Sequence, residues 1–431
     1  MAEDKFHAII VGAGPAGSTA AYLLAREGLD VLLIEKGSAP GSKNMFGGRM
    51  YSHALHRIIP NFWEEAPVER PVTREIITFL NGGKSVSLNC QDVSWAKPPY
   101  HSFTLLRAEF DAWLASKAEE AGAILATNVR VDAPLKEKGK VVGIRAGEDE
   151  MLADVVIAAD GVNSILAQQS GLSKGFTAGQ VATGAKEVIE LPAETIRQRF
   201  QVEGEQGAVQ LFVGDCTRGL RGAGFLYTNK NSVSLGLVIG TAALAQCRVK
   251  MSEAVEEFKE NPHVTPLIEG GQVAEYSAHL VPEAGLGMQP QLFGDGILVV
   301  GDAAGFSLNL GYIVRGMDFA IESGAAAAKA VWKAKVRKDF SRQGLSPYHA
   351  FLKESFVMRD LEAYRSAQHF MENERLFNEY PRLITELVSK LFRVDGTPPV
   401  HVLAKVMSEV KQQQVSMFQL ARDSWKGAKS L

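Results

Sequence analysis

The chain has 431 residues, of which 46% are hydrophobic and 22% charged, so its length and composition allow two or three domains with large cores. Its formal net charge of −3 argues against nucleic acid as a partner. The three cysteines (Cys90, Cys216 and Cys247) lie far apart, form no CxxC motif and cannot supply the four thiolates of an iron–sulfur cluster. We expect inert thiols in a reducing cytoplasm.

No secretory leader is expected at the N-terminus, because Asp4 and Lys5 run directly into an apolar strand. No apolar run reaches the roughly 18–20 residues that cross a bilayer. These features predict a protein that is soluble or only peripherally bound to a membrane.

The first predicted unit is a strand, a glycine-rich turn, a helix and a second strand. The strands cover residues 7–11 and 31–34, and the helix covers 18–26. The turn between them reads Gly12-Ala13-Gly14-Pro15-Ala16-Gly17. Gly12 permits the tight turn, Gly14 lets a pyrophosphate approach the backbone, and Gly17 lets the helix lie close to the sheet.

Glu35 ends the second strand, where its carboxylate can accept hydrogen bonds from both ribose hydroxyls and would repel a 2′-phosphate. The free N–H groups at the start of the helix favour phosphates. A GxGxxG pattern alone can be an ordinary turn, but its flanking elements and the acid predict an adenine dinucleotide. The motif does not choose between FAD and NAD.

Residues 37–49 form a glycine-rich loop with the cations Lys36, Lys43 and Arg49 close by. This loop can run beside the phosphates or a flavin ring, or it can be a plain surface loop. After it, residues 51–104 mix short strands (73–80 and 85–88) with loops rich in Pro and polar residues, which indicates an insertion.

Regular α/β structure is expected to resume near residue 105, with a helix at 108–121 and then strands at 124–125, 129–131, 141–144, 151–152 and 154–159. The last strand ends at Asp160-Gly161. The pattern then becomes antiparallel, with a helix at 252–260 and strands at 208–214, 222–228, 232–240 and 273–280. It predicts a second domain inserted into the first.

A late strand at 296–300 leads into a second glycine-rich turn, Gly301-Asp302-Ala303-Ala304-Gly305, and an alanine-rich helix follows at about 316–332. A carboxylate such as Asp302 can hydrogen-bond to the ribityl hydroxyls of a flavin. The helix start can face the N1/O2 edge of the ring, where reduction places negative charge. Asp302 alone would be read as a turn or N-cap residue. Together, the two distant units favour FAD over NAD.

Four segments resemble the FAD-dependent family that includes p-hydroxybenzoate hydroxylase and geranylgeranyl reductase: IVGAGPAGSTAAYLLAREGLDVLLIEK, LLRAEFDAWL, VVIAADGVNSIL and GILVVGDAAG. Four others resemble electron-transfer-flavoprotein–quinone oxidoreductases of the FixC type more narrowly: SKNMFGGRMYSHAL, GFLYTNKNSVSLGLVIG, YSAHLVPEAG and LNLGYIVRGMDFAI. The resemblance covers essentially the whole chain.

The resemblance implies an α/β fold with a discontinuous Rossmann-like FAD-binding domain of the glutathione reductase-2 type (1–50, 105–175 and 283–335). It also implies an inserted antiparallel β domain for the substrate or quinone (51–104 and 176–282) and a helical C-terminal region (336–431). The FAD contacts that we expect are Gly12, Gly14, Pro15, Ala16, Gly17, Glu35, Lys36, Gly47, Gly48, Arg49, Arg107, Val131, Asp160, Gly161, Gly301, Asp302, Ala304, Gly311, Arg315, Gly316 and Met317.

By this resemblance, Glu35 holds the adenosine ribose, Val131 lies by the adenine, and residues 311–317 lie along the isoalloxazine. Arg107 could instead be a surface cation at a helix start, and Asp160 could simply cap a turn. Arg315 is a weak catalytic candidate, because it either stabilises the reduced flavin or only pairs with a neighbouring acid. No metal site is expected, and His53, His56 and His279 are not assigned as proton donors.

FixC-type proteins work with a two-subunit electron-transfer flavoprotein and a small ferredoxin-like iron–sulfur subunit. The resemblance therefore implies electron transfer from that flavoprotein to a membrane quinone, as one branch of flavin-based electron bifurcation. The mitochondrial-type enzymes carry four cysteines in a ferredoxin-like region at their C-terminal end. This chain lacks them, which fits a FixC-type protein that works with a separate iron–sulfur subunit. We expect a cytoplasmic protein attached to the inner face of the cell membrane, through the antiparallel domain or C-terminal side chains such as Leu387, Leu391 and Phe392.

Two other functions remain open at this stage. One is an FAD-dependent monooxygenase or geranylgeranyl-type reductase that uses a reduced pyridine nucleotide. The other is an assembly subunit with a redox-inert FAD. The sequence has no second GxGxxG motif, which favours electrons arriving from a protein.

Overall fold

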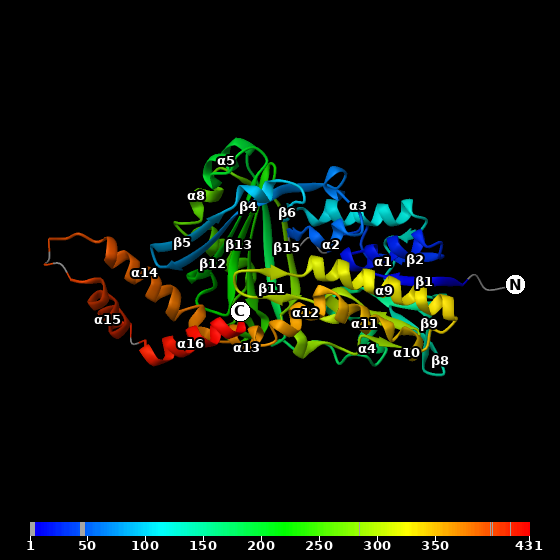
Figure 1. Cartoon of the computed structure of the whole chain (residues 1–431). Helices are drawn as coiled ribbons and strands as arrows, with labels where there is room; N and C mark the ends of the chain where they lie inside the picture. The colour runs from blue at the N-terminus through cyan, green and yellow to red at the C-terminus, as the bar shows by residue number, and fades with distance from the viewer. Residues whose placement is uncertain (1–4, 44–47, 284, 397, 399, 414) are drawn as a thin grey trace.

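The computed structural model describes residues 5–43, 48–283, 285–396, 398, 400–413 and 415–431. The predicted FAD contact Gly47 lies outside these residues. The predicted α/β fold is confirmed: two sheets carry helices on their faces and a set of C-terminal helices follows (Figure 1).

The first sheet contains the N-terminal strand. Its order is β16 (Phe293–Gly294), β17 (Ile297–Val299), β10 (Asp149–Ala158), β1 (Phe6–Val11), β2 (Val31–Ile34) and β7 (Ile124–Ala126). Its pairs are parallel from β17 to β7, and β16 is antiparallel to β17. The apolar runs of β1, β2 and β17 are buried on both faces, as parallel strands require.

The helices α1 (Pro15–Arg26), α3 (Arg107–Glu120) and α9 (Met317–Arg337) pack beside this sheet, with α1 in contact with both of the others (Figure 1). The sequence predicts two separate strands at 151–152 and 154–159, but in the structure both segments belong to the single strand β10. The first half of β10 pairs antiparallel with β9 (Lys140–Ala146), and β9 in turn pairs with β8 (Ala133–Glu137).

The predicted strand at 129–131 is wrong, because no strand is formed there. The Val129 N–H donates to the Glu35 carbonyl oxygen at 3.0 Å, so the chain turns past the end of β2 after β7.

The second sheet has the order β15 (Gln272–Pro282), β11 (Val181–Glu190), β14 (Ser232–Gly240), β13 (Gly222–Thr228), β12 (Gly207–Gly214), β4 (Val68–Asn81), β6 (Ser102–Leu105) and β3 (Arg49–Tyr51). The strand β5 (Lys84–Gln91) pairs with β4. The sheet is antiparallel apart from the β12–β4 pair, which is parallel. We propose that the two sheets correspond to the two predicted domains.

Short helices complete both layers: α2 (His53–His56), α4 (Ile165–Gln169), α5 (Ala193–Phe200), α6 (Thr241–Cys247), α7 (Met251–Lys259) and α8 (Thr265–Ile268). Helix α7 buries its apolar side on the second sheet, where Phe258 contacts Phe212 edge-on with ring centroids 5.2 Å apart. Burying such aromatic side chains anchors the helix.

The C-terminal region is helical, with α10 (Arg342–Leu345), α11 (Pro347–Glu354), α12 (Phe356–Ala363), α13 (Ala367–Met371), α14 (Glu379–Phe392), α15 (Val402–Gln412) and α16 (Met417–Ser430). Figure 1 shows α14 and α15 at the end of the molecule opposite the N-terminus, while α13 and α16 run below the second sheet. Among the described residues, no helix is long and apolar enough to cross a membrane.

Candidate functional site

A cavity of about 470 Å³ lies where the two sheets and the C-terminal helices meet. Both glycine-rich turns open into it, the second sheet forms a wall, and α12 and α13 contribute side chains. It therefore brings together segments that are far apart in the sequence.

The first turn has the backbone geometry that its glycines predict. Gly12 has φ +107°, and a Cβ there would lie 2.2 Å from the Ala159 carbonyl oxygen. A Cβ on Gly17 would lie 1.9 Å from the Gly12 carbonyl oxygen. Gly14 differs, since a Cβ there would meet nothing within 4 Å. The open space beside Gly14 is the space that a phosphate group needs to reach the backbone.

Helix α1 starts at this open space. Gly14 is its N-cap residue and supplies no side-chain cap, and Pro15 occupies the start of the helix. The first N–H groups of a helix lack intrahelical acceptors and carry partial positive charge, so they attract an anion. Together with the space at Gly14, they fit the pyrophosphate of a dinucleotide.

The second glycine-rich turn lies next to the first. Gly301 begins the 3-10 helix η6 (Gly301–Ala304), and a Cβ there would be 3.1 Å from the Cβ of Ala16. On α9, a Cβ at Gly324 would be 2.2 Å from the Ala16 carbonyl oxygen. The two small-residue contacts hold α1, η6 and α9 together, so the two turns face one cavity.

Asp302 and Arg107 form the charged part of this region. Burial raises the pKa of Asp302, and the Arg107 guanidinium opposes that shift. Arg107 itself is buried and donates to Asp111 on the next turn of α3, at 2.9 Å from Nε and 2.6 Å from Nη2. Arg107 is therefore not the exposed surface cation that one reading of the sequence allows.

Glu35 is buried, and both of its carboxylate oxygens accept backbone N–H groups. Oε2 accepts from Ala13 at 3.1 Å and Oε1 accepts from Gly37 at 2.8 Å. Each carboxylate oxygen keeps a further lone pair for a hydroxyl. Lys36 is exposed and Val131 is half-buried, and the cavity lining includes none of these three residues.

Asp160 lies just past the end of β10, and its carboxylate accepts an N–H at the start of α4. Its Oδ2 accepts the N–H of Leu166 at 2.9 Å, while its Oδ1 is buried without a hydrogen-bond partner. Burial raises the pKa of this carboxyl, although backbone hydrogen bonds act in the opposite direction. The neighbouring Gly161 lines the cavity, so the turn reaches the site through its backbone.

Arg49 lines the cavity together with Gly48, but its guanidinium is engaged by the second sheet. It forms an ion pair with Glu75 of β4 and donates from Nε to the Ser102 hydroxyl at 3.3 Å. It also lies over the Tyr51 ring, 4.6 Å from the centroid. These contacts fix the start of β3 at the cavity.

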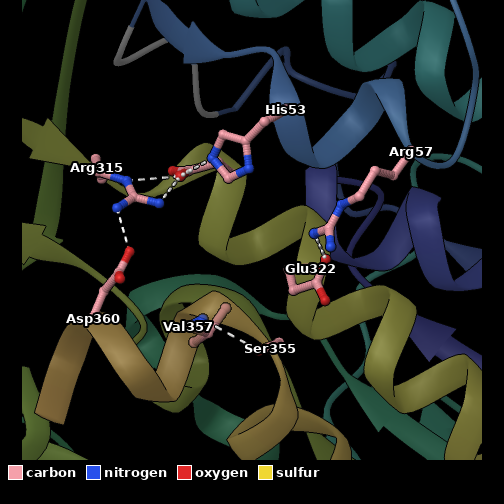
Figure 2. A network of polar contacts seen from close by, with 8 residues as sticks. His53, Arg57, Arg315, Glu322, Ser355, Val357 and Asp360 are labelled. Atoms are coloured by element: carbon pink, nitrogen blue, oxygen red, sulfur yellow. Dashed lines mark hydrogen bonds and ion pairs between the residues drawn. The ribbon is translucent and has the colours of Figure 1, made fainter.

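Arg315 pairs with neighbouring acids, which is the second of its two predicted roles. Its Nε donates to Asp318 at 2.8 Å, and its Nη1 forms an ion pair with Asp360. Figure 2 shows Arg315 and Asp360 facing each other, with Arg57 and Glu322 forming a separate pair nearby. Two carboxylates therefore offset the charge of Arg315, which weakens its case as the group that stabilises a reduced flavin.

The structure thus brings about two thirds of the predicted residues to one cavity. These are Gly14, Pro15, Ala16, Gly48, Arg49, Arg107, Gly161, Gly301, Asp302, Gly311, Arg315, Gly316 and Met317. The lining does not include the others that the structure describes, namely Gly12, Gly17, Glu35, Lys36, Val131, Asp160 and Ala304. Gly12 and Gly17 instead shape the first glycine-rich turn. Glu35 follows β2 and accepts the N–H of Ala13 in that turn, but it does not line the cavity.

The sequence did not assign a site role to several residues of the cavity, although it considered His279 as a proton donor. His279 lies on its wall with Nε2 buried and unpartnered, and burial, with the cations Arg107 and Lys36, lowers the pKa of His279 to about 4. Arg221 and Glu283 form an ion pair on the same wall. Glu283 and His279 belong to the YSAHLVPEAG segment, whose position at the end of a strand was the available signal.

Much of the remaining wall is apolar, although polar side chains such as Ser307, Arg365 and Gln368 also line the cavity. The second sheet contributes aliphatic and aromatic side chains, and residues around α13 face them: Ile77, Phe79, Leu211, Val213, Phe225, Val238, Val281, Phe370, Met371, Leu376 and Phe377. A surface of this kind suits a flat ring and an apolar chain better than a sugar or a peptide.

Comparisons with known proteins agree with this geometry. An FAD-binding domain family matches residues 5–202, and the "ETF-QO/FixC family C-terminal domain" matches residues 367–431. The chain is 49% identical to the "Probable electron transfer flavoprotein-quinone oxidoreductase YdiS" of Escherichia coli (strain K12), over 100% of both chains. It is 48% identical to "Protein FixC" of Salmonella typhi, over 99% of both.

A solved structure with the same fold is a geranylgeranyl bacteriochlorophyll reductase-like protein from Thermoplasma acidophilum. It superposes with a TM-score of 0.72 over 98% of this chain and 99% of that one, at 22% identity. The open space at Gly14, the start of α1 and the carboxylate of Asp302 fit FAD, the cofactor that the matched family binds. The chain belongs to the ETF-QO/FixC family and is an FAD-dependent oxidoreductase.

Proposed function

We propose that the protein passes electrons from a reduced electron-transfer flavoprotein, through FAD, to a membrane quinone. The observation that carries this proposal is a single cavity in which phosphate-binding turns face an apolar wall. The name of its relative YdiS points to the same acceptor.

When bound, FAD supplies the chemistry, since a flavin can take and give electrons singly or in pairs. This chain's residues would position it: α1 and Gly14 would hold the pyrophosphate, and Asp302 would accept hydrogen bonds from the ribityl hydroxyls. The apolar wall takes the acceptor ring and excludes water from it, which strengthens every polar contact inside. In this arrangement the reaction requires no nucleophile from the protein.

We also propose that the C-terminal helices rest on the inner face of the cell membrane. Around α14, α15 and α16 the exposed fraction is 84% for Phe392, 97% for Val394, 74% for Leu403, 76% for Phe418 and 65% for Trp425. Residues 382–431 contain eight Lys and Arg against four Asp and Glu, in a chain of net charge −3. Exposed apolar and aromatic side chains with an excess of cations suit an anionic lipid surface.

From the resemblance to FixC-type proteins, we also propose the partners: a two-subunit electron-transfer flavoprotein and a small ferredoxin-like iron–sulfur subunit, which would form a cytoplasmic bifurcating complex with this chain. Purifying the native complex tests this part. Co-purification of both partners supports it, and isolation of the chain alone contradicts it.

The test of the central proposal uses the flavin spectrum of the purified protein. Reduced electron-transfer flavoprotein should bleach the FAD absorbance, and a soluble quinone analogue should restore it within one turnover. NADPH alone should leave the spectrum unchanged. Rapid bleaching by NADPH would favour a monooxygenase or a geranylgeranyl-type reductase. A reduced flavin that no quinone reoxidises would indicate a redox-inert subunit.

A further inference from the structure

An ion pair lies among the apolar side chains that the second sheet contributes to the cavity wall. Arg221 lies immediately before β13 and Glu283 immediately after β15, and both line the cavity. Arg221 Nη2 is 2.8 Å from Glu283 Oε2, and the side chains are 22% and 9% exposed. Because both side chains are largely buried, the pair loses part of its hydration, and that cost needs to be offset by what the pair does at the cavity.

Glu283 also connects the pair to the segment that the family resemblance places along the flavin ring. Its Oε1 accepts from Asn309 Nδ2 at 3.3 Å, and Asn309 Oδ1 accepts the N–H of Gly311 at 2.9 Å. Asn309 ends β18 (Leu308–Asn309), which pairs with β19 (Val314–Arg315) across the Gly311 turn. The carboxylate therefore fixes Arg221 relative to that turn.

Glu283 occupies only part of the donor capacity of Arg221. A guanidinium presents several N–H groups in a rigid plane, and the described structure pairs its Nη2 with Glu283. Ala223, Val238 and Val281 on the same wall carry no side-chain donor. The nearby hydroxyl of Ser307 already donates to the Pro282 carbonyl oxygen at 2.7 Å, and the amide of Asn309 donates to Glu283. A carbonyl oxygen that enters this part of the cavity finds its hydrogen-bond donor in Arg221.

We propose that Arg221, oriented by Glu283, receives a ring carbonyl oxygen of the electron acceptor, and that this contact selects acceptors with a carbonyl-bearing ring and apolar substituents. The inference rests on the proposed quinone reduction and names the residue that recognises the ring. Arg221 is the catalytic residue here, and Glu283 and Asn309 are positioning residues.

The contact has a chemical consequence for the reaction. Two electrons from the reduced flavoprotein and two protons from water convert the two C=O groups of a quinone to C–OH groups. Negative charge grows on a ring oxygen when electrons arrive before protons. A fixed guanidinium stabilises that charge, and it does so more effectively away from bulk water.

The test compares two electron acceptors in single-turnover experiments. Photoreduced protein is mixed with a soluble short-chain quinone or with ferricenium, which takes one electron and has no ring oxygen. In R221M, the limiting rate with the quinone should fall by about tenfold or more, while the ferricenium rate stays within about twofold of wild type. R221K should recover part of the loss, and E283Q should slow the quinone reaction less than R221M does.

The matched control is R218Q, which breaks the exposed Arg218–Glu257 pair three residues before Arg221 in the chain and outside the cavity lining. It should leave both rates unchanged. FAD absorbance and the melting temperature show whether each variant is folded. If R221M does not fold, the quinone and ferricenium rates of R221K and E283Q test the proposal instead.

Folded R221M and E283Q that reduce the quinone at the wild-type rate would overturn the role of Arg221 and leave the proposed function standing. Equal losses with quinone and ferricenium would also overturn it, because they indicate a structural pair. Wild-type protein that reduces ferricenium but no quinone would overturn both proposals.

Discussion

Asp423 on α16 is expected to hold that helix against the body of the protein through its charge. Asn373 Nδ2 donates to its Oδ2 at 2.9 Å, Arg375 Nε donates at 2.8 Å and the Tyr380 hydroxyl donates at 2.6 Å. Burial alone raises the pKa of this carboxyl, but the hydrogen bonds from Tyr380, Arg375 and Asn373 together lower it to about 2. Its ordinary value is 3.8.

This shift sets the expected magnitude. A drop from 3.8 to about 2 favours the folded, ionised state by about 2 kcal/mol, at about 1.4 kcal/mol for each pKa unit. Because the pKa of the folded state is depressed, this stability is present above pH 3.8 and is lost as the pH falls toward 2. D423N keeps the shape of the side chain but removes the charge, so the loss should appear already at pH 7.

Hydrogen exchange of the backbone amides in α16 is the assay, because it reports the local opening of one helix in a large protein. About 2 kcal/mol corresponds to roughly 30-fold faster exchange in D423N. In wild type, exchange corrected for its intrinsic pH dependence should accelerate below about pH 4, whereas in D423N it should not. D395N, which alters an exposed pair with Arg393, is the control. Wild-type exchange rates in D423N would refute the reasoning.

Three further predictions concern the cofactor, the membrane and the Arg315 network. G14V should fold but bind FAD at least about tenfold more weakly, since its side chain fills the space of the phosphates. G17A should lower the melting temperature through its clash in the turn, and flavin fluorescence and thermal melting separate the two effects. F392D combined with W425D should abolish flotation with anionic vesicles without changing the FAD spectrum. Flotation equal to that of wild type would contradict the proposal that the C-terminal helices bind the membrane. D318N should lower the melting temperature by several degrees, because it removes a buried carboxylate that Arg315 and His53 contact, and calorimetry measures this.

The local parts of the site could be predicted because each depends on neighbours in the sequence. Gly12, Gly14 and Gly17 sit in one turn, and the strand and helix beside them fix its geometry. The Ala-rich helix after Asp302 was predictable for the same reason, although it runs on to Arg337. In these segments short-range backbone preferences and tertiary packing agree.

The long-range contacts could not be predicted. Arg315 meets Asp360 and Arg221 meets Glu283, and the 45 and 62 residues that separate the partners give no periodic signal. The strand expected at 129–131 does not form, because the Val129 N–H donates to the Glu35 carbonyl oxygen, and the sequence pattern gives no sign of that long-range contact. The parallel pairing of β4 with β12 is likewise decided by the whole sheet.

The contact between α1 and α9 has a consequence for biosynthesis. A ribosome that has made only the first 200 residues has released the first glycine-rich turn, but not Gly301, Asp302 or the helix that packs at Gly324 against Ala16. At about 5–20 residues per second, the remaining elements follow within roughly half a minute or less. Until then the nascent protein has only one of the two glycine-rich turns that line the cavity. FAD should therefore bind late in synthesis, and truncated products should be colourless.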